Sequence, residues 1–109
     1  MIWTAWKNGK HGAAGVSYGF KVHLSDRPKF NRAWQTVRIT LVPPVSGIDV
    51  VVNIEKDSFW NGTCMELIST DIREWLYHNG LTAWPKGKPH RFKVDVVGRG
   101  HYRVQLASH

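Results

Sequence analysis

The sequence predicts an α+β protein with a mainly antiparallel sheet of about six strands and one amphipathic helix packed on one face of the sheet. Segments in which apolar and polar residues alternate recur along the chain, and turn residues separate them. One stretch in the second half has a helical period instead. The expected order is strand, strand, strand, strand, helix, strand, strand. A chain of 109 residues is the size of one compact domain, which we place at 1–109.

The N-terminal part contains two strand candidates. Ile2–Trp6 is a short one, and a glycine-rich loop, Asn8–Gly15, follows it. Tyr18–Leu24 alternates, with its even-numbered apolar residues on one face, which is typical of a half-buried strand. The polar stretch Ser25–Arg32 then interrupts the pattern.

The segments Thr36–Val42 and Ile48–Ile54 predict a hairpin. The apolar residues are odd-numbered in the first segment and even-numbered in the second. Directly opposed residues share a face, so the numbers of each pair must sum to an odd value. A four-residue loop, Pro43–Ser46, meets this condition, and proline favours a turn. The expected pairs are Leu41 with Ile48, Ile39 with Val50 and Val37 with Val52.

One helix is predicted to begin near residue 63. Thr63 and Glu66 have the spacing of a capping box, and Asn79-Gly80 is a typical helix end. At about 100° per residue the apolar side chains fall on one face. That face would hold Cys64, Met65, Ile68, Ile72, Trp75 and Leu76, while Thr70 would face water.

The last hairpin joins Phe92–Val97 to Tyr102–Leu106. Both apolar sets are even-numbered, so the loop must have odd length, and Gly98–Gly100 fits. The expected pairs are Phe92 with Leu106, Val94 with Val104 and Val96 with Tyr102. On the other face Asp95 would lie opposite Arg103, an opposite-charge cross-strand pair.

The charge of the chain indicates a polyanionic partner. Fifteen Lys and Arg against eight Asp and Glu give a net charge of +7. The basic residues gather in the first forty residues and from Lys86 onward, whereas the middle of the chain is acidic. A basic surface attracts nucleic acid by releasing its counterions, although net charge also serves plain solubility. We therefore interpret the chain as a small basic accessory protein, of bacterial type, that binds DNA or RNA without catalysis.

The candidate binding residues lie in two loops. The segment 84–91 combines an aromatic ring with cations, a mixture that binds single strands. A solvated connector with Trp84 packed in the core is the alternative. The first loop, Gly9-Lys10-His11-Gly12, has the form of the GXXG loop of KH modules, but its flanks are strands and not helices. Together the candidates are Lys7, Lys10, His11, Trp84, Lys86, Lys88, His90 and Arg91.

Two other functions compete with this hypothesis. A small ribonuclease of the bacterial toxin type would use His11, His23 or His90 beside a cation for acid–base cleavage. A binder of small planar or cationic ligands would use a cleft lined by some of the six tryptophans. Neither pattern assigns a catalytic residue.

The remaining motifs predict little chemistry. No metal-ligand or cofactor spacing is present, so we expect neither group. Glu55 and Lys56 would point to opposite faces of a strand, which argues against a nuclease of the restriction type. A single cysteine and the lack of a spanning or signal segment favour a cytoplasmic protein that does not enter a membrane. Val51 and Val97 would lie on the polar face of the sheet, so this second face could form a homodimer.

Overall fold

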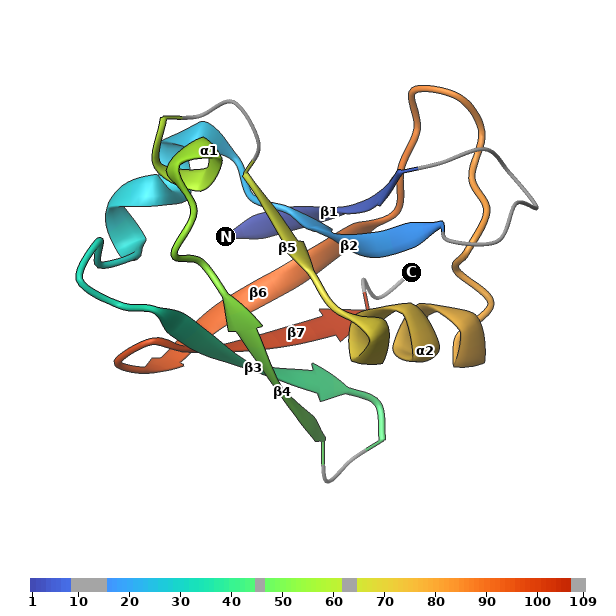
Figure 1. Cartoon of the computed structure of the whole chain (residues 1–109). Coiled ribbons are helices and arrows are strands. Elements are labelled where there is room, and N and C mark those ends of the chain that lie inside the picture. Colours follow the sequence, from blue (N-terminus) through green and yellow to red (C-terminus); the bar gives the residue numbers. More distant parts are fainter. Residues whose placement is uncertain (9–15, 45–46, 62–64, 107–109) are drawn as a thin grey trace.

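All seven strands of the computed structural model belong to one curled sheet (Figure 1). The structure describes residues 1–8, 16–44, 47–61 and 65–106. The strands are β1 (Ile2–Asn8), β2 (Ser17–Lys21), β3 (Thr36–Val42), β4 (Ile48–Asn53), β5 (Glu66–Ile68), β6 (Arg91–Gly98) and β7 (His101–Leu106). The helices are η1 (Leu24–Lys29, a 3₁₀ helix), α1 (Asp57–Trp60) and α2 (Thr70–His78). The expected α+β class is confirmed.

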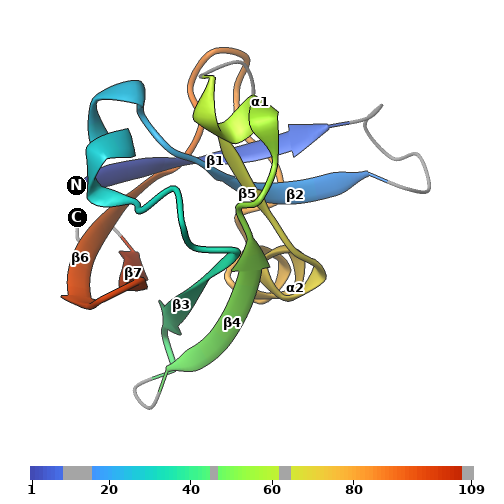
Figure 2. The ribbon, with the colours of Figure 1, turned by 60° about the vertical axis from the view of Figure 1, so that its left-hand side comes forward.

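The strand order is β4-β3-β7-β6-β1-β2-β5, which corrects the expected six-stranded antiparallel sheet. The described residues form seven strands, and β3 pairs with β7 in parallel, whereas the other neighbours are antiparallel. The parallel pairing joins the β3–β4 hairpin to the β6–β7 hairpin. The sheet bends so far that its edge strands β4 and β5 approach each other, as Figure 2 shows.

The registers of both expected hairpins are confirmed. β3 and β4 pair Leu41 with Ile48, and the two other expected pairs, Ile39 with Val50 and Val37 with Val52, are also present. The predicted loop Pro43–Ser46 lies partly outside the described residues. β6 and β7 pair Val94 with Val104, with a bulge between Val96 and Gly98. Gly100 has φ +66°, which lets the turn close.

The expected helix start is wrong. Thr63 and Cys64 lie outside the described residues, and Glu66–Ile68 forms strand β5 on the edge of β2. Helix α2 is capped by Ser69, whose hydroxyl accepts a hydrogen bond from the Asp71 N–H at 3.1 Å. The strand turns Leu67 inward and leaves Ile68 39% exposed, so Ile68 is not a core residue. The helix end at Asn79-Gly80 is confirmed, with Gly80 at φ +68°.

A glycine allows β5 to join the sheet. Gly19 lies opposite Ile68, and a Cβ at position 19 would stand 2.2 Å from the Leu67 carbonyl oxygen. No side chain fits there without moving the β5 backbone. Glycine at position 19 therefore permits the β5 backbone to approach β2 closely. The alternating pattern of the sequence does not reveal this role.

The second strand is shorter than expected. β2 ends at Lys21, and η1 begins three residues later at Leu24. His23 caps η1, because its Nδ1 accepts the Ser25 N–H at 3.2 Å. Leu24 was expected on the buried face, but it is 57% exposed because it belongs to this helical turn and not to the strand.

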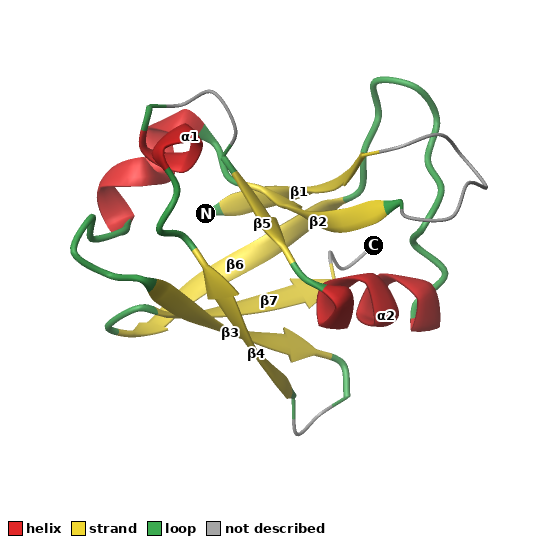
Figure 3. Cartoon of the chain, viewed as in Figure 1, coloured by secondary structure: helices red, strands yellow, loops and turns green. Residues whose placement is uncertain are grey.

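The hydrophobic core fills the concave side of the sheet. Helix α2 contributes Ile72, Trp75 and Leu76, while η1 and α1 lie together at the other end (Figure 3). The Trp75 ring meets the rings of Phe20 and Phe92 at 5.9 and 5.5 Å between centroids. The convex side, which we call the outer face, carries the alternate residues of each strand.

Candidate nucleic-acid interface

The outer face is rich in cations from strands far apart in the sequence. The registers place Arg38 beside His101, Thr40 beside Arg103, and Thr4 between Arg91 and Lys21. All of these side chains point away from the core, because residues opposite each other across a sheet share a face. The cations of the outer face are Lys21, Arg38, Arg91, Lys93 and Arg103.

Few of these cations are neutralised. All eight acidic residues lie in the described ranges, yet those ranges contain only two salt bridges. Arg103 pairs with Asp95 at 3.4 Å, which confirms the expected cross-strand pair, and Lys29 pairs with Asp26 at 3.2 Å. Within the described part of the chain no carboxylate lies within 4.0 Å of the Lys21 or Arg91 charge. Both cations are exposed and available to an external anion.

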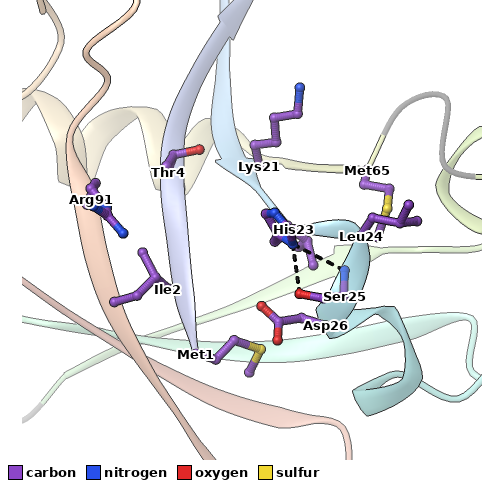
Figure 4. Close-up of a pocket in the computed structure, with 11 residues that line it drawn as sticks. Met1, Ile2, Thr4, Lys21, His23, Leu24, Ser25, Asp26, Met65 and Arg91 are labelled. Atoms are coloured by element: carbon purple, nitrogen blue, oxygen red, sulfur yellow. Dashed lines mark hydrogen bonds between the residues drawn. The ribbon is translucent and has the colours of Figure 1, made fainter.

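Lys21 and Arg91 flank a cavity of about 690 Å³ (Figure 4). The two cations stand on either side of the strand that carries Thr4. The rest of the lining mixes polar residues (Thr4, His23, Ser25 and Asp26) with apolar ones, two of which are exposed: Ile2 at 42% and Leu24 at 57%. The full apolar lining is Met1, Ile2, Val22, Leu24 and Met65. The cavity thus combines two unpaired cations with polar and apolar surface.

His23 stands at the same cavity in a defined orientation. Its Nδ1 accepts hydrogen bonds from the Ser25 N–H at 3.2 Å and from the Ser25 hydroxyl at 2.7 Å. With Nδ1 as the acceptor, Nε2 carries the ring proton and can donate. Asp26 lines the cavity too, but it is engaged by Lys29.

Trp84 forms a second group together with Lys7 and His90. The Lys7 ammonium lies 4.5 Å from the centroid of the Trp84 ring, and the His90 ring meets Trp84 edge-on at 5.8 Å. The His90 Nε2–H donates to the Ala83 carbonyl at 2.9 Å. Trp84 is partly buried and packs against the core, as the packing alternative expects, whereas its role in nucleic-acid binding stays a prediction.

The predicted residues do not form one flat patch. The Lys7 side chain is on the same face of β1 as the core residues Trp3 and Ala5. Arg91 lies opposite Thr4 and is on the outer face. Lys86 and Lys88 are exposed in a turn closed by the Lys88 N–H to the Pro85 carbonyl at 2.9 Å. Lys10 and His11 lie outside the described residues.

Sequence reasoning missed a network centred on His101. An Arg38 Nη2–H donates to His101 Nδ1 at 3.0 Å, and His101 Nε2–H donates to the Thr40 hydroxyl at 2.7 Å. Thr40 in turn donates to Asp49 at 2.6 Å. Partial burial, followed by the Arg38 charge, lowers the pKa of His101, although Asp49 opposes this shift. No local signal reveals the network, because 63 residues separate Arg38 from His101.

The residues of the competing hypotheses are dispersed. His23 lines the outer cavity and His90 contacts Trp84, and no described contact joins these two histidines. Trp3 and Trp75 are core residues, Trp34 and Trp60 pack against the core, and no tryptophan lines the 690 Å³ cavity among the described residues.

The described ranges contain no group of three His, Cys, Asp or Glu side chains placed to hold a metal ion. No helix within them is long and apolar enough to cross a membrane. Comparison with family models, with curated proteins and with solved structures yields no match for this chain.

Proposed function

We propose that this protein binds nucleic acid through the outer face around β1, with Lys21 and Arg91 holding backbone phosphates. The observation that carries the proposal is the pair of unneutralised cations on either side of Thr4, which line the 690 Å³ cavity. Neighbouring strands are about 4.8 Å apart, so the two backbones stand about 10 Å from each other. An extended polyanion can lie across both residues.

Single-stranded nucleic acid fits this surface better than a duplex does. Apolar side chains line the same cavity as the two cations. The faces of unstacked bases in a single strand can pack on such surface. Ile2 and Leu24 are the exposed residues of this lining. A duplex hides its base faces, so it would meet the cations alone.

The lysines around Trp84 would contact the same ligand, while the Trp84 ring itself is covered. The Lys7 ammonium covers the Trp84 ring, so a base that stacks there must first displace it. A phosphate can instead bind Lys7 without moving the ring. We therefore assign Lys7, Lys86 and Lys88 to backbone contact beyond the cavity.

The test is the salt dependence of binding to a fluorescein-labelled dT12, followed by anisotropy. Each phosphate contact on a single strand contributes about 0.7 to the slope of log affinity against log salt. The double variant Lys21→Ala/Arg91→Ala should lower that slope by about 1.4. The double variant Lys86→Ala/Lys88→Ala measures, in the same way, how much the loop contributes to the salt slope. Arg73→Ala is the control, because it removes an exposed cation from α2, which packs on the concave side.

The outcomes separate the alternatives. No binding at low salt would contradict the proposal, as would an unchanged slope in the Lys21/Arg91 variant with wild-type folding by circular dichroism. A slope that falls only in the Lys86/Lys88 variant would move the interface to the loop. Labelled duplex of the same length should bind more weakly than dT12.

A further inference from the structure

A second hollow lies on the outer face, away from the cavity of Figure 4. It measures about 280 Å³ and occupies the space between the start of β3 and the turn that joins β6 to β7. Its lining consists of Trp34, Thr36, Arg38, Arg99, Gly100 and His101. Small-molecule sites begin near 300 Å³, so this hollow is just below the usual size, and a compact ligand would stand partly outside it.

The walls of the hollow are held in place by the backbone. The Arg38 N–H donates to the Gly100 carbonyl at 2.8 Å, which fixes the turn against β3. A Cβ at Gly100 would stand 3.7 Å from each of three atoms of the Trp34 ring. Equal distances to three ring atoms place Gly100 over one face of the ring. The indole is thus braced from one side and half-buried.

The Arg38 guanidinium is oriented before any ligand arrives. Arginine can only donate, so His101 Nδ1 is the acceptor in their 3.0 Å hydrogen bond, and Nε2 carries the proton. That proton goes to Thr40, whose own hydroxyl proton goes to Asp49. The chain of hydrogen bonds uses one guanidinium N–H and leaves the other donors of Arg38 for an anion. Arg99 adds a second guanidinium, and no carboxylate among the described residues pairs with it.

From this geometry we infer that the hollow binds one nucleotide unit, with its base on Trp34 and its phosphate between Arg38 and Arg99. Guanidinium groups bind phosphate oxygens with paired hydrogen bonds, and indole faces stack on bases. The unit can be a free mononucleotide or part of a strand, and only the second source rests on the proposed function. In a strand it would give the outer face a second contact, separate from Lys21 and Arg91.

The experiment follows the Trp34 indole N–H signal by NMR while AMP is added to ¹⁵N-labelled protein. Trp34→Phe identifies the signal. AMP should shift it, and Arg99→Ala should weaken the affinity about tenfold, since a charge-assisted contact is lost. Arg32→Ala is the matched control, because it removes an exposed arginine that lies 5.5 Å from another tryptophan, Trp60. Adenosine and inorganic phosphate should each bind more weakly than AMP.

A second arm replaces AMP by unlabelled dT12. A shift with AMP alone would identify a free nucleotide as the ligand, and a shift with dT12 alone would identify a unit of a strand. No shift with either ligand, or equal weakening by Arg99→Ala and Arg32→Ala, would overturn the inference. The proposed function fails by a different result, namely an unchanged salt slope in the Lys21→Ala/Arg91→Ala variant.

Discussion

At the scale of single residues, neighbours from other strands determine what a side chain can do. His101 is one of six histidines and has no motif around it. Its two ring nitrogens are nevertheless engaged by Arg38 and Thr40, so it orients an arginine and is not a free base. A histidine with both nitrogens occupied is a poor candidate for the acid–base role that a ribonuclease requires.

The His101 network predicts a pH dependence of stability. Because the pKa of His101 is lowered in the folded state, the unfolded chain binds more protons, and the free energy of unfolding rises with pH. The stabilisation from neutral His101 is complete above about pH 6.5, the unfolded pKa, and is lost as the pH falls through the lower folded value. Urea unfolding at pH 7.5 and 5.5 should show a larger acid loss for the wild type than for His101→Gln. Equal losses would mean that protonation of His101 does not disturb the fold.

Leu67 and Ile68 provide a second test at this scale. Leu67 is fully buried, whereas Ile68 is 39% exposed. Leu67→Ala should lower the free energy of unfolding by about 2–5 kcal/mol, the range for a buried large-to-small change. Ile68→Ala should cost clearly less in the same urea titration. A larger loss for Ile68→Ala than for Leu67→Ala would contradict strand β5 and support the sequence prediction that Ile68 lies on the buried face of a helix.

At the scale of elements, the start of α2 shows how two sequence signals compete. Thr63 and Glu66 have capping-box spacing, but Glu66–Ile68 pairs with β2 instead. Backbone hydrogen bonds to a sheet edge satisfy those residues without a helix, and Ser69 then supplies the cap. In this chain the pairing of Glu66–Ile68 with β2 therefore prevails over the capping-box spacing, and the helix begins later.

The cap itself can be tested. Ser69→Ala removes the acceptor of the Asp71 N–H and should cost about 1 kcal/mol. Thr70→Ala is the control, because this exposed side chain caps nothing in the structure, and its effect should stay within about 0.5 kcal/mol. Thermal melts followed by circular dichroism measure both. Similar losses at the two positions would contradict Ser69 as the cap.

At the scale of the whole molecule, Tyr102 joins parts of the chain that are far apart in sequence. Its hydroxyl donates to the Lys29 carbonyl at 2.7 Å, and its ring stacks on Phe30 at 4.8 Å between centroids. This contact ties β7 to η1 across 73 residues. Tyr102 also lies in β7, the strand that joins the two hairpins of the sheet.

Tyr102→Phe should lower the free energy of unfolding by about 1 kcal/mol at neutral pH, because one hydrogen bond is lost. Burial raises the pKa of Tyr102 to about 12, so the folded state resists ionisation that the unfolded chain undergoes near pH 10. The stabilisation is complete below pH 10 and falls as the pH rises toward 12. Tyr102→Phe should remove this alkaline loss in urea titrations. Tyr77→Phe is the control, because Tyr77 is 68% exposed, and a loss that persists in Tyr102→Phe would contradict the assignment.

The sequence by itself determined the hairpins and their registers. The β3–β4 and β6–β7 pairs follow from alternation and loop length, because both partners are near in the chain and a one-residue slip would turn the apolar side chains outward. Only the tertiary structure decided the parallel β3–β7 pair, the docking of β5 and the His101 network. These contacts join segments up to 63 residues apart, so no local pattern in the sequence reveals them. The basic loops were visible in the sequence, but the pairing of Lys21 with Arg91 around Thr4 required the strand order.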